Sequence, residues 1–427
     1  MKTSLRRLGV LLWVALLCGL SPSATPRGAA GVPGGVHAAR PDGRAELRYP
    51  KGAGREAPAP VLGRVLRPMG TCSLPAHVLP VNVSESPADS RFPVLAVSSD
   101  QVHVVWEENG RIYHRFSHNS AWSAVRSVAT GEQPVIAMDG AGTLHLILVN
   151  EFGGNYEIYH CRWNGAAWSL PRNVSNTSGV SSAPSLAIAA DGTLHVVWAD
   201  NTPGYNVIYH ALWDGRYWIN APIPNALGGA PAVAVSPDGA AHVVWQDRET
   251  PTAPYDIYHS EWRSGAWTLP EDLSETQNEP SIIPDVTSDG SNRVHVVWQE
   301  RINGQYAIYY AVGRTGSWSQ PESASDAGSD AYLPCVSVGA GNVLYAGWDE
   351  STSVLYRQRS PGGFSESPVI VVASDPAGVS DVRLALDEGG RLHAVWAQRV
   401  AAGNRDVFYV RLSFETFLPV AFKRGGY

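Results

Sequence analysis

Cysteine and long apolar stretches are scarce in this chain of 427 residues, and each scarcity excludes a class of protein. Only Cys72, Cys161 and Cys335 follow the apolar run at the amino end, and this odd number gives no disulfide framework. No segment beyond that run has the roughly 18 consecutive apolar residues of a membrane-spanning helix. We therefore expect neither a disulfide-rich scaffold nor a membrane span in the mature chain.

Motifs for the commonest cofactor and nucleophile chemistries are also missing. The chain has no P-loop, no GxSxG elbow, no HExxH motif and no paired-cysteine metal motif. Histidines recur at equivalent places in separate repeats, but all ligands of one ion must lie within roughly 2 Å of it. We expect no metal and no other cofactor, and a structural role for the recurring histidines. These are His103, His145, His195, His242, His295 and His393.

Glycine (42), proline (31), tyrosine (17) and tryptophan (15) are abundant instead. This mixture is typical of many short strands joined by tight turns. Of the 32 basic and 39 acidic residues, 11 and 3 lie in residues 1–67, which leaves 21 basic and 36 acidic residues in the remainder. Nucleic acid requires a basic protein surface, so this acidic body predicts no nucleic-acid partner.

The amino end resembles an export signal. Lys2 and two arginines precede an apolar run from Val10 to Leu20, and small residues follow. We assign residues 1–21 to a signal peptide and residues 22–67 to a disordered linker rich in Pro, Gly, Ala and Arg. A lipoprotein would need Cys18 as its first mature residue, but Leu17 stands where a small residue is required. We expect a secreted or cell-surface protein and not a lipoprotein.

A four-residue motif, HVVW in its strongest form, recurs at intervals of about 48 residues. Each repeat carries four strand signals, named A to D here. Strand A follows a proline, strand B is the recurring motif, strand C is an IYH segment, and a Gly–Trp turn leads to strand D. Four antiparallel strands per repeat predict an all-β, seven-bladed β-propeller. The seven copies are His103–Trp106, His145–Leu148, His195–Trp198, His242–Trp245, His295–Trp298, Tyr345–Trp348 and His393–Trp396.

The seventh repeat lacks a clear strand D, whereas a spare one precedes the first repeat. The sequence LPVNVSES at Leu79–Ser86 matches the D strand LPRNVSNT at Leu170–Thr177. We predict that this N-terminal strand completes the last blade and removes two exposed sheet edges, with Phe417–Val420 as a competing candidate. The predicted propeller spans residues 68–417 and a tail spans 418–427. Its blades are expected at about 87–130, 131–180, 181–227, 228–277, 278–329, 330–379 and 380–417, the last completed by 78–86.

The turns between strands C and D, such as Trp163–Trp168 and Trp213–Trp218, resemble degenerate Asp-box (BNR) repeats of sialidase-like propellers. The usual pattern Ser-x-Asp-x-Gly-x-x-Trp is eroded, and only Asp214 lies near the place of its aspartate. In that family these turns are structural, so the resemblance implies a fold and not an activity. Active sialidases are usually six-bladed, and the seven repeats of this chain depart from that pattern.

The B–C loops and D–A connections of a propeller share one face, and two sets of residues map onto it. The first set lies two residues after the strand B tryptophan, where every blade has an acid or amide. It is either a ring that holds cations or sugar hydroxyls, or a repeated cap on strand B, and its uniformity favours the cap. Its members are Glu108, Asn150, Asp200, Asp247, Glu300, Glu350 and Gln398.

The second set breaks the symmetry of the repeats. Arg248, Arg301 and Arg399 stand one residue further along, and arginine forks bind carboxylates bidentately. The alternative is that they form ordinary surface ion pairs with the acid ring. Residues two before the strand A proline, or its equivalent, vary in the same way. They are Arg91, Glu132, Ser182, Gly229, Asn278, Tyr332 and Ser380.

Sialidases are similar in using three arginines for a sugar carboxylate, one of them in an RIP motif that Arg91–Pro93 resembles. Under this resemblance, Tyr332 with Glu350 or Glu300 would act as the tyrosine nucleophile and its base. The resemblance keeps a sialidase-like glycoside hydrolase, acting on a carboxylate-bearing sugar, as the alternative function.

No convincing catalytic constellation accompanies the repeats. The sequence therefore predicts an exported, monomeric, non-catalytic propeller that binds a carbohydrate or a cell-surface protein. Convergence of Arg91, Arg248, Arg301 and Tyr332 over the central channel would favour the hydrolase. The residues predicted to bind the ligand are Arg91, Arg248, Arg301, Arg399, Glu108, Asp200 and Asp247.

Overall fold

The computed structural model describes residues 80–412, apart from 251, 275–278, 327, 361, 366–367, 373–377 and 401–402. These residues belong to one compact unit, Ser73–Tyr427. The expected signal peptide, linker and tail, and the competing strand at Phe417–Val420, lie outside the described residues. Apart from the short 3-10 turn η1 (Ala340–Asn342), every described element is a strand. No helix in this part of the chain is long and apolar enough to cross a membrane.

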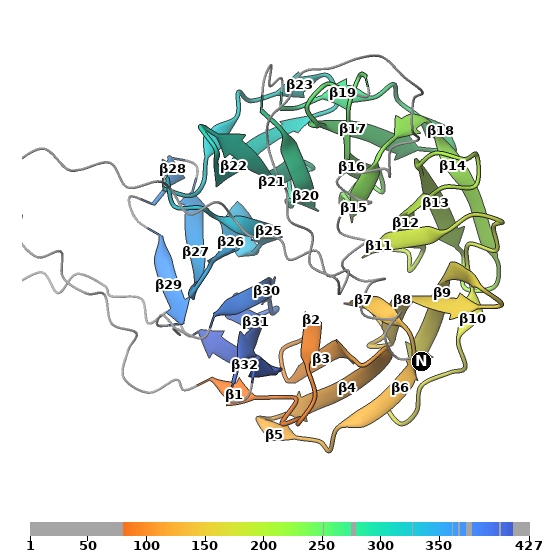
Figure 1. The fold of residues 1–427 in the computed structure, drawn as a ribbon, viewed down its shortest axis with the longest axis vertical. Helices are drawn as coiled ribbons and strands as arrows, with labels where there is room; N and C mark the ends of the chain where they lie inside the picture. Colours follow the sequence, from red (N-terminus) through yellow and green to blue (C-terminus); the bar gives the residue numbers. More distant parts are fainter. Residues whose placement is uncertain are drawn as a thin grey trace, which may run out of the picture. The chain divides into compact units, whose positions relative to one another are not determined.

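Seven antiparallel sheets surround a common centre, each with its first strand innermost (Figure 1). Successive strands of a blade lie side by side from the centre outwards, and in four blades the outermost strand is split into two short pieces. Blade one contains β2 (Ser90–Val97), β3 (Gln101–Glu108), β4 (Arg111–His118), β5 (Ala121–Trp122) and β6 (Arg126–Thr130). Blade two contains β7 (Glu132–Met138), β8 (Leu144–Phe152), β9 (Asn155–Trp163) and β10 (Arg172–Asn173). Blade three contains β11 (Ser181–Ile188), β12 (Leu194–Asp200), β13 (Val207–Trp213) and β14 (Trp218–Leu227).

The remaining blades repeat this order. Blade four contains β15 (Gly229–Val235), β16 (Ala241–Asp247), β17 (Asp256–Arg263), β18 (Ala266–Trp267) and β19 (Glu271–Asp272). Blade five contains β20 (Ser281–Ser288), β21 (Val294–Ile302), β22 (Gln305–Arg314), β23 (Ser317–Trp318) and β24 (Glu322–Ser323). Blade six contains β25 (Tyr332–Val338), β26 (Leu344–Glu350), β27 (Ser353–Ser360), β28 (Gly363–Phe364) and β29 (Val369–Val372). Blade seven contains β30 (Val379–Leu386), β31 (Leu392–Arg399) and β32 (Arg405–Leu412), and its fourth strand is β1 (Val81–Asn82).

The ring is closed by pairing the first described strand with the last. Val81 lies opposite Tyr409 in an antiparallel register, and β1 lies beside β32 in Figure 1. Val83 N–H donates to the carbonyl of Val407 at 2.7 Å, and the Val83 side chain is fully buried. The Asn82 amide donates to Asp406 Oδ2 at 2.7 Å. The prediction of a seven-bladed propeller completed by an N-terminal strand is therefore confirmed.

The core lies between neighbouring blades. The strand B tryptophans are fully buried, and each packs on the blade before it. Trp245 of blade four, for example, contacts the cluster that contains Val197 and Ile208 of blade three. Apolar burial of this kind holds one sheet against the next, so each blade depends on its neighbours.

The recurring histidines form buried pairs within blades. Nδ1 of His103 lies 3.0 Å from Nε2 of His114, and the same pairing recurs in blades two, three and four at 3.0 to 3.2 Å. Tyr310 and Tyr409 take the second place in blades five and seven. The histidines therefore have the structural role that the sequence predicts.

Candidate functional site

Every strand A begins with a β-bulge on the face that carries the B–C loops. The residue before the strand A proline has a positive φ, as at Phe92 (49°) and Leu333 (50°), and the ladder shifts register there. In blade five the bulge is at Ile283, before Pro284. The prediction of Asn278, which counts from Pro280, is therefore wrong: Ile282 occupies the equivalent position. Asn278 itself lies outside the described residues.

The acid and amide set is bonded within the blades. The side chain two residues after the strand B tryptophan accepts that tryptophan's indole N–H at 2.7 Å for Glu300 and 2.9 Å for Glu350. Asp200 accepts the equivalent bond at 3.1 Å and a hydroxyl bond from Ser181 at 2.8 Å. Glu108 accepts a bond from Ser90 at 3.1 Å, and Asp247 accepts one from the N–H of Arg248 at 2.7 Å. These bonds favour the capping interpretation, although the partners are mainly side chains.

The predicted arginines contact partners in or next to their own blades. Arg248 lies over the ring of Tyr255, with 5.2 Å to the centroid, and Arg301 Nε lies 3.8 Å from a carboxylate oxygen of Glu279. Arg91 binds Asp89. No contact between described residues brings Arg91, Arg248, Arg301 and Tyr332 together.

Two of the four predicted arginines share a neighbourhood between blades seven and one. Asp89 accepts a bond from Arg91 Nε at 2.8 Å and one from Arg405 Nε at 3.0 Å. Burial alone would raise the pKa of Asp89, but the bonds from Arg405 and Arg91 hold it below its ordinary value. Arg405 lines the same pocket as Arg399. The structure thus places Arg91 and Arg405 on one carboxylate, and Arg405 beside Arg399 in the pocket.

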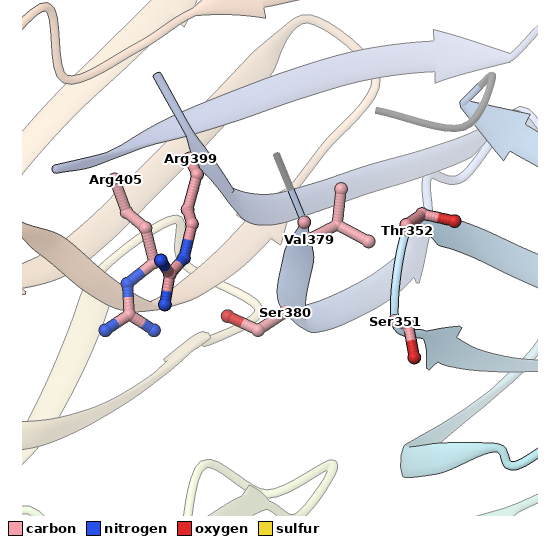
Figure 2. Close-up of a pocket in the computed structure, with 7 residues that line it drawn as sticks. Ser351, Thr352, Val379, Ser380, Arg399 and Arg405 are labelled. Carbon is pink, nitrogen blue, oxygen red and sulfur yellow. The ribbon is translucent and has the colours of Figure 1, made fainter. Parts of the chain in front are cut away.

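The pocket has a volume of about 390 Å³ and lies between blades six and seven. In Figure 2, the guanidinium groups of Arg399 and Arg405 lie next to each other, and the hydroxyl of Ser380 points toward them. Among the described residues, no carboxylate forms an ion pair with Arg399. Ser380 also donates to Asp381 at 2.9 Å. The residues around the pocket are Ser351, Thr352, Gly378, Val379, Ser380, Arg399 and Arg405.

Two buried carboxyl groups on this face were missed by the sequence analysis. Asp349 lies opposite Tyr332 in the ladder and is only 5% exposed, and its Oδ1 has no hydrogen-bond partner in the described part of the chain. Burial and the charge of Asp381 raise the pKa of Asp349 to about 8. Burial and the nearby Glu132 raise the pKa of Glu107 to about 7. The carboxyl group beside Tyr332 is therefore Asp349, since Glu300 and Glu350 bind indoles.

The position of these two groups explains their burial. Both stand one residue after a strand B tryptophan, where Gln246 and Gln299 stand in blades four and five. Gln246 accepts the N–H of Ile283 at 2.9 Å, and Gln299 accepts that of Leu333 at 3.2 Å. A side chain at this position therefore connects one blade to the bulge of the next blade. No group of three or more His, Cys, Asp or Glu among the described residues is arranged to hold a metal ion.

No protein-family model matches the chain, and no curated protein matches it in sequence. An ulvan lyase of polysaccharide lyase family PL25, solved with -[GlcA(1-4)Rha3S]-, is similar in structure, with a TM-score of 0.60 and 10% identity over 78% of this chain and 96% of that one. A protein of unknown function from Dyadobacter fermentans has a TM-score of 0.51 and 12% identity over 79% of this chain and 99% of its own. The leech intramolecular trans-sialidase has a TM-score of 0.47 and 12% identity over 78% of this chain and 68% of its own. For the ulvan lyase and the Dyadobacter protein, at these identities, the similarity is one of fold.

Proposed function

We propose that this protein is an exported, non-catalytic propeller that binds a carboxylate-bearing carbohydrate in the pocket between blades six and seven. The proposal depends chiefly on Arg399, an exposed guanidinium group with no ion pair among the described residues, beside Arg405 in the same pocket. A guanidinium fork matches the two oxygens of a carboxylate. The hydroxyls of Ser351, Thr352 and Ser380 supply the neutral hydrogen bonds that sugar hydroxyls need.

The size of the pocket and the fold agree with this ligand class. A volume of about 390 Å³ lies within the ~300–1,000 Å³ that is usual for small-ligand sites. The ulvan lyase of the same fold was solved with a saccharide that contains a glucuronate, so such a propeller can present an acidic-sugar site. Export is proposed from Lys2 and the apolar run Val10–Leu20 alone.

The test is titration calorimetry with glucuronate-containing oligosaccharides and their neutral counterparts. Wild-type protein should bind the acidic series, and Arg399→Ala should weaken binding about tenfold or more because a charge-assisted bond is lost. Arg301→Ala is the matched control, since Arg301 stands at the equivalent place in blade five and should leave affinity unchanged. Equal losses in both variants, or equal affinity for neutral sugars, would remove the support for this pocket.

A sialidase-like hydrolase is the second candidate, and the pairing of Tyr332 with Asp349 favours it. A buried carboxyl group with a pKa near 8 is suited to hold or accept a proton beside a tyrosine nucleophile. Turnover of a fluorogenic sialoside or uronide that Tyr332→Phe abolishes would establish this activity. Binding of such sugars without turnover would contradict the hydrolase and support the non-catalytic function.

A further inference from the structure

The outer rim of the propeller carries opposite charges on blades two and four. Opposite the strand C histidine, blade two has Arg172 and blade four has Glu271. Opposite the strand B histidine, blade two has Arg162 and blade four has Glu261. The C–D turns are on the opposite face from the B–C loops, so this charge division lies away from the sugar pocket.

Four rim arginines of blades one to three have no ion pair in the described part of the chain, namely Arg126, Arg162, Arg172 and Arg216, whereas Arg115 of blade one pairs with Glu85 at 2.9 Å. Arg126 donates to the carbonyl of Ala166 at 3.0 Å, and Arg172 donates to the carbonyl of Arg216 at 3.2 Å. These bonds connect each rim arginine to the C–D turn of the next blade. The nearby carboxylate is Asp214, whose Oδ1 accepts backbone N–H groups of its own turn.

Some rim arginines of the other blades form ion pairs, whereas Arg314 of blade five bonds to the carbonyl of Ser291. Arg263 of blade four pairs with Asp238 at 2.8 Å and with Glu261 at 2.7 Å. Arg359 of blade six pairs with Glu322 at 2.8 Å. The body has more acidic than basic residues, and we call the part of the rim that carries Arg162, Arg172 and Arg216 the basic sector.

Large apolar side chains project from the same sector. Leu170 is 89% exposed, Ile219 is 69% exposed and Tyr217 is 55% exposed. Leu170 stands two residues before Arg172, and Tyr217 follows Arg216, whose guanidinium lies 5.3 Å from the centroid of the Tyr217 ring. The bond from Arg172 to Arg216 joins the two halves into one surface. This arginine–aliphatic patch consists of Arg162, Leu170, Arg172, Arg216, Tyr217 and Ile219.

We propose that the arginine–aliphatic patch docks the propeller on an anionic lipid surface. Guanidinium groups attract anionic headgroups, while leucine, isoleucine and tyrosine side chains enter the boundary between headgroups and acyl chains. A protruding aliphatic side chain that is nearly fully exposed can enter a fluid apolar layer, which offers burial without a complementary pocket. The patch serves a site separate from the sugar pocket and does not depend on it.

Other occupants fit less well. A saccharide stacks on aromatic rings and gains little from the tips of Leu170 and Ile219. The chain's own segment 22–67 carries eight Lys+Arg and three Asp+Glu, so its positive charge would be repelled by the arginines. That segment would instead be attracted to the same anionic lipid surface.

The test is sedimentation of the purified full-length protein with phosphatidylglycerol/phosphatidylcholine vesicles and with phosphatidylcholine vesicles. We expect binding to the anionic vesicles that weakens with added salt. Leu170→Asp should lower the partition coefficient about tenfold, and Arg172→Gln about fivefold. Leu269→Asp is the matched control, because Leu269 stands at the equivalent place in blade four, is 77% exposed, and should bind like the wild type.

Three results would overturn the proposal. One is the absence of any preference for anionic vesicles. Another is an equal effect of Leu170→Asp and Leu269→Asp, which would attribute vesicle binding to another part of the chain. The third is a protein that does not bind vesicles but binds a soluble sulfated polysaccharide, with an affinity that Leu170→Asp leaves unchanged. The arginines would then recognise a polyanion and not a lipid surface.

Discussion

The indole N–H of Trp168 in blade two donates a hydrogen bond to Nδ1 of His114 in blade one, at 3.2 Å. Since Nδ1 accepts, the proton of His114 is on Nε2, 3.0 Å from Nδ1 of His103. His103 in turn donates from Nε2 to the Gln101 side chain at 3.0 Å. This directional series requires two neutral imidazoles, because a protonated one would place two donors face to face.

The first prediction is that acid weakens the fold between about pH 6.5 and pH 4. Burial lowers the pKa of His103 to about 4 and that of His114 to about 3, from an ordinary 6.5. The unfolded chain takes up protons below pH 6.5 while the folded pairs stay neutral, so the free energy of unfolding falls across this window. Denaturant unfolding at pH 7, 5.5 and 4.5 measures it. His160→Tyr, which copies the His–Tyr pair of blade five, should reduce the slope, and an unchanged slope would contradict the explanation.

The second prediction concerns closure of the ring. Val83→Ala should lower the free energy of unfolding by roughly 2 kcal/mol, because the Val83 side chain is fully buried next to the β1–β32 pair. Val125→Ala is the control, since Val125 is exposed and should change stability by less than about 0.5 kcal/mol. Deletion of residues 68–86 should cost much more. Equal denaturation midpoints for the deletion and the wild type would refute closure by β1.

A third prediction concerns a glycine in a D–A connection. A Cβ on Gly228, where φ is +99°, would clash with the carbonyl oxygen of Gln246. Gly228→Ala should therefore cost about 3 kcal/mol, whereas Gly215→Ala should cost about 1 kcal/mol from its positive φ alone, since no atom lies within 4 Å of that Cβ. Thermal and denaturant unfolding of the two variants compare these costs. Similar losses would show that the bulge region can relax.

The fourth prediction uses the buried carboxyl group of Asp349. Its pKa of about 8 lies above the ordinary 3.8, so the unfolded chain releases this proton first and ionisation opposes folding as the pH rises from 4 to 8. Asp349→Asn should therefore be more stable than the wild type by an amount that grows across this range and then levels off. Its unfolding free energy should be compared with that of the wild type at pH 4, 6 and 8. A difference in unfolding free energy that does not change with pH would show that Asp349 is not the group that holds this proton.

The repeat made most of the fold predictable. A strand motif that occurs seven times, at intervals of about 48 residues, predicts seven equivalent sheets. The unmatched D strand at Leu79–Ser86 indicated how the ring closes. The bulge was harder to predict, because Pro280 and Pro284 both lie two residues before an apolar residue, and only the ladder shows that the positive φ falls at Ile283.

The site was less accessible to sequence reasoning. Three of the residues that stand two positions after a strand B tryptophan were predicted to bind the ligand. In the structure their side chains bond to their own blade. The carboxyl groups whose pKa is raised to about 7 and about 8 are Glu107 and Asp349, one residue earlier, which face the next blade because side chains alternate along a strand. Arg405 was missed because it begins strand C after a loop whose length varies among the repeats, and its place opposite Arg399 is set by the β31–β32 register.

The pairing of Val81–Asn82 with β32 also sets an order of events. During synthesis the first described strand is made more than 300 residues before its partner, Arg405–Leu412, so the ring remains open until that partner has emerged. An incomplete chain exposes the unpaired edge of its last sheet and cannot bury Val83. Completion of the ring therefore requires that translation has passed β32, and a product truncated before β32 is distinguished by an open edge that proteases can recognise.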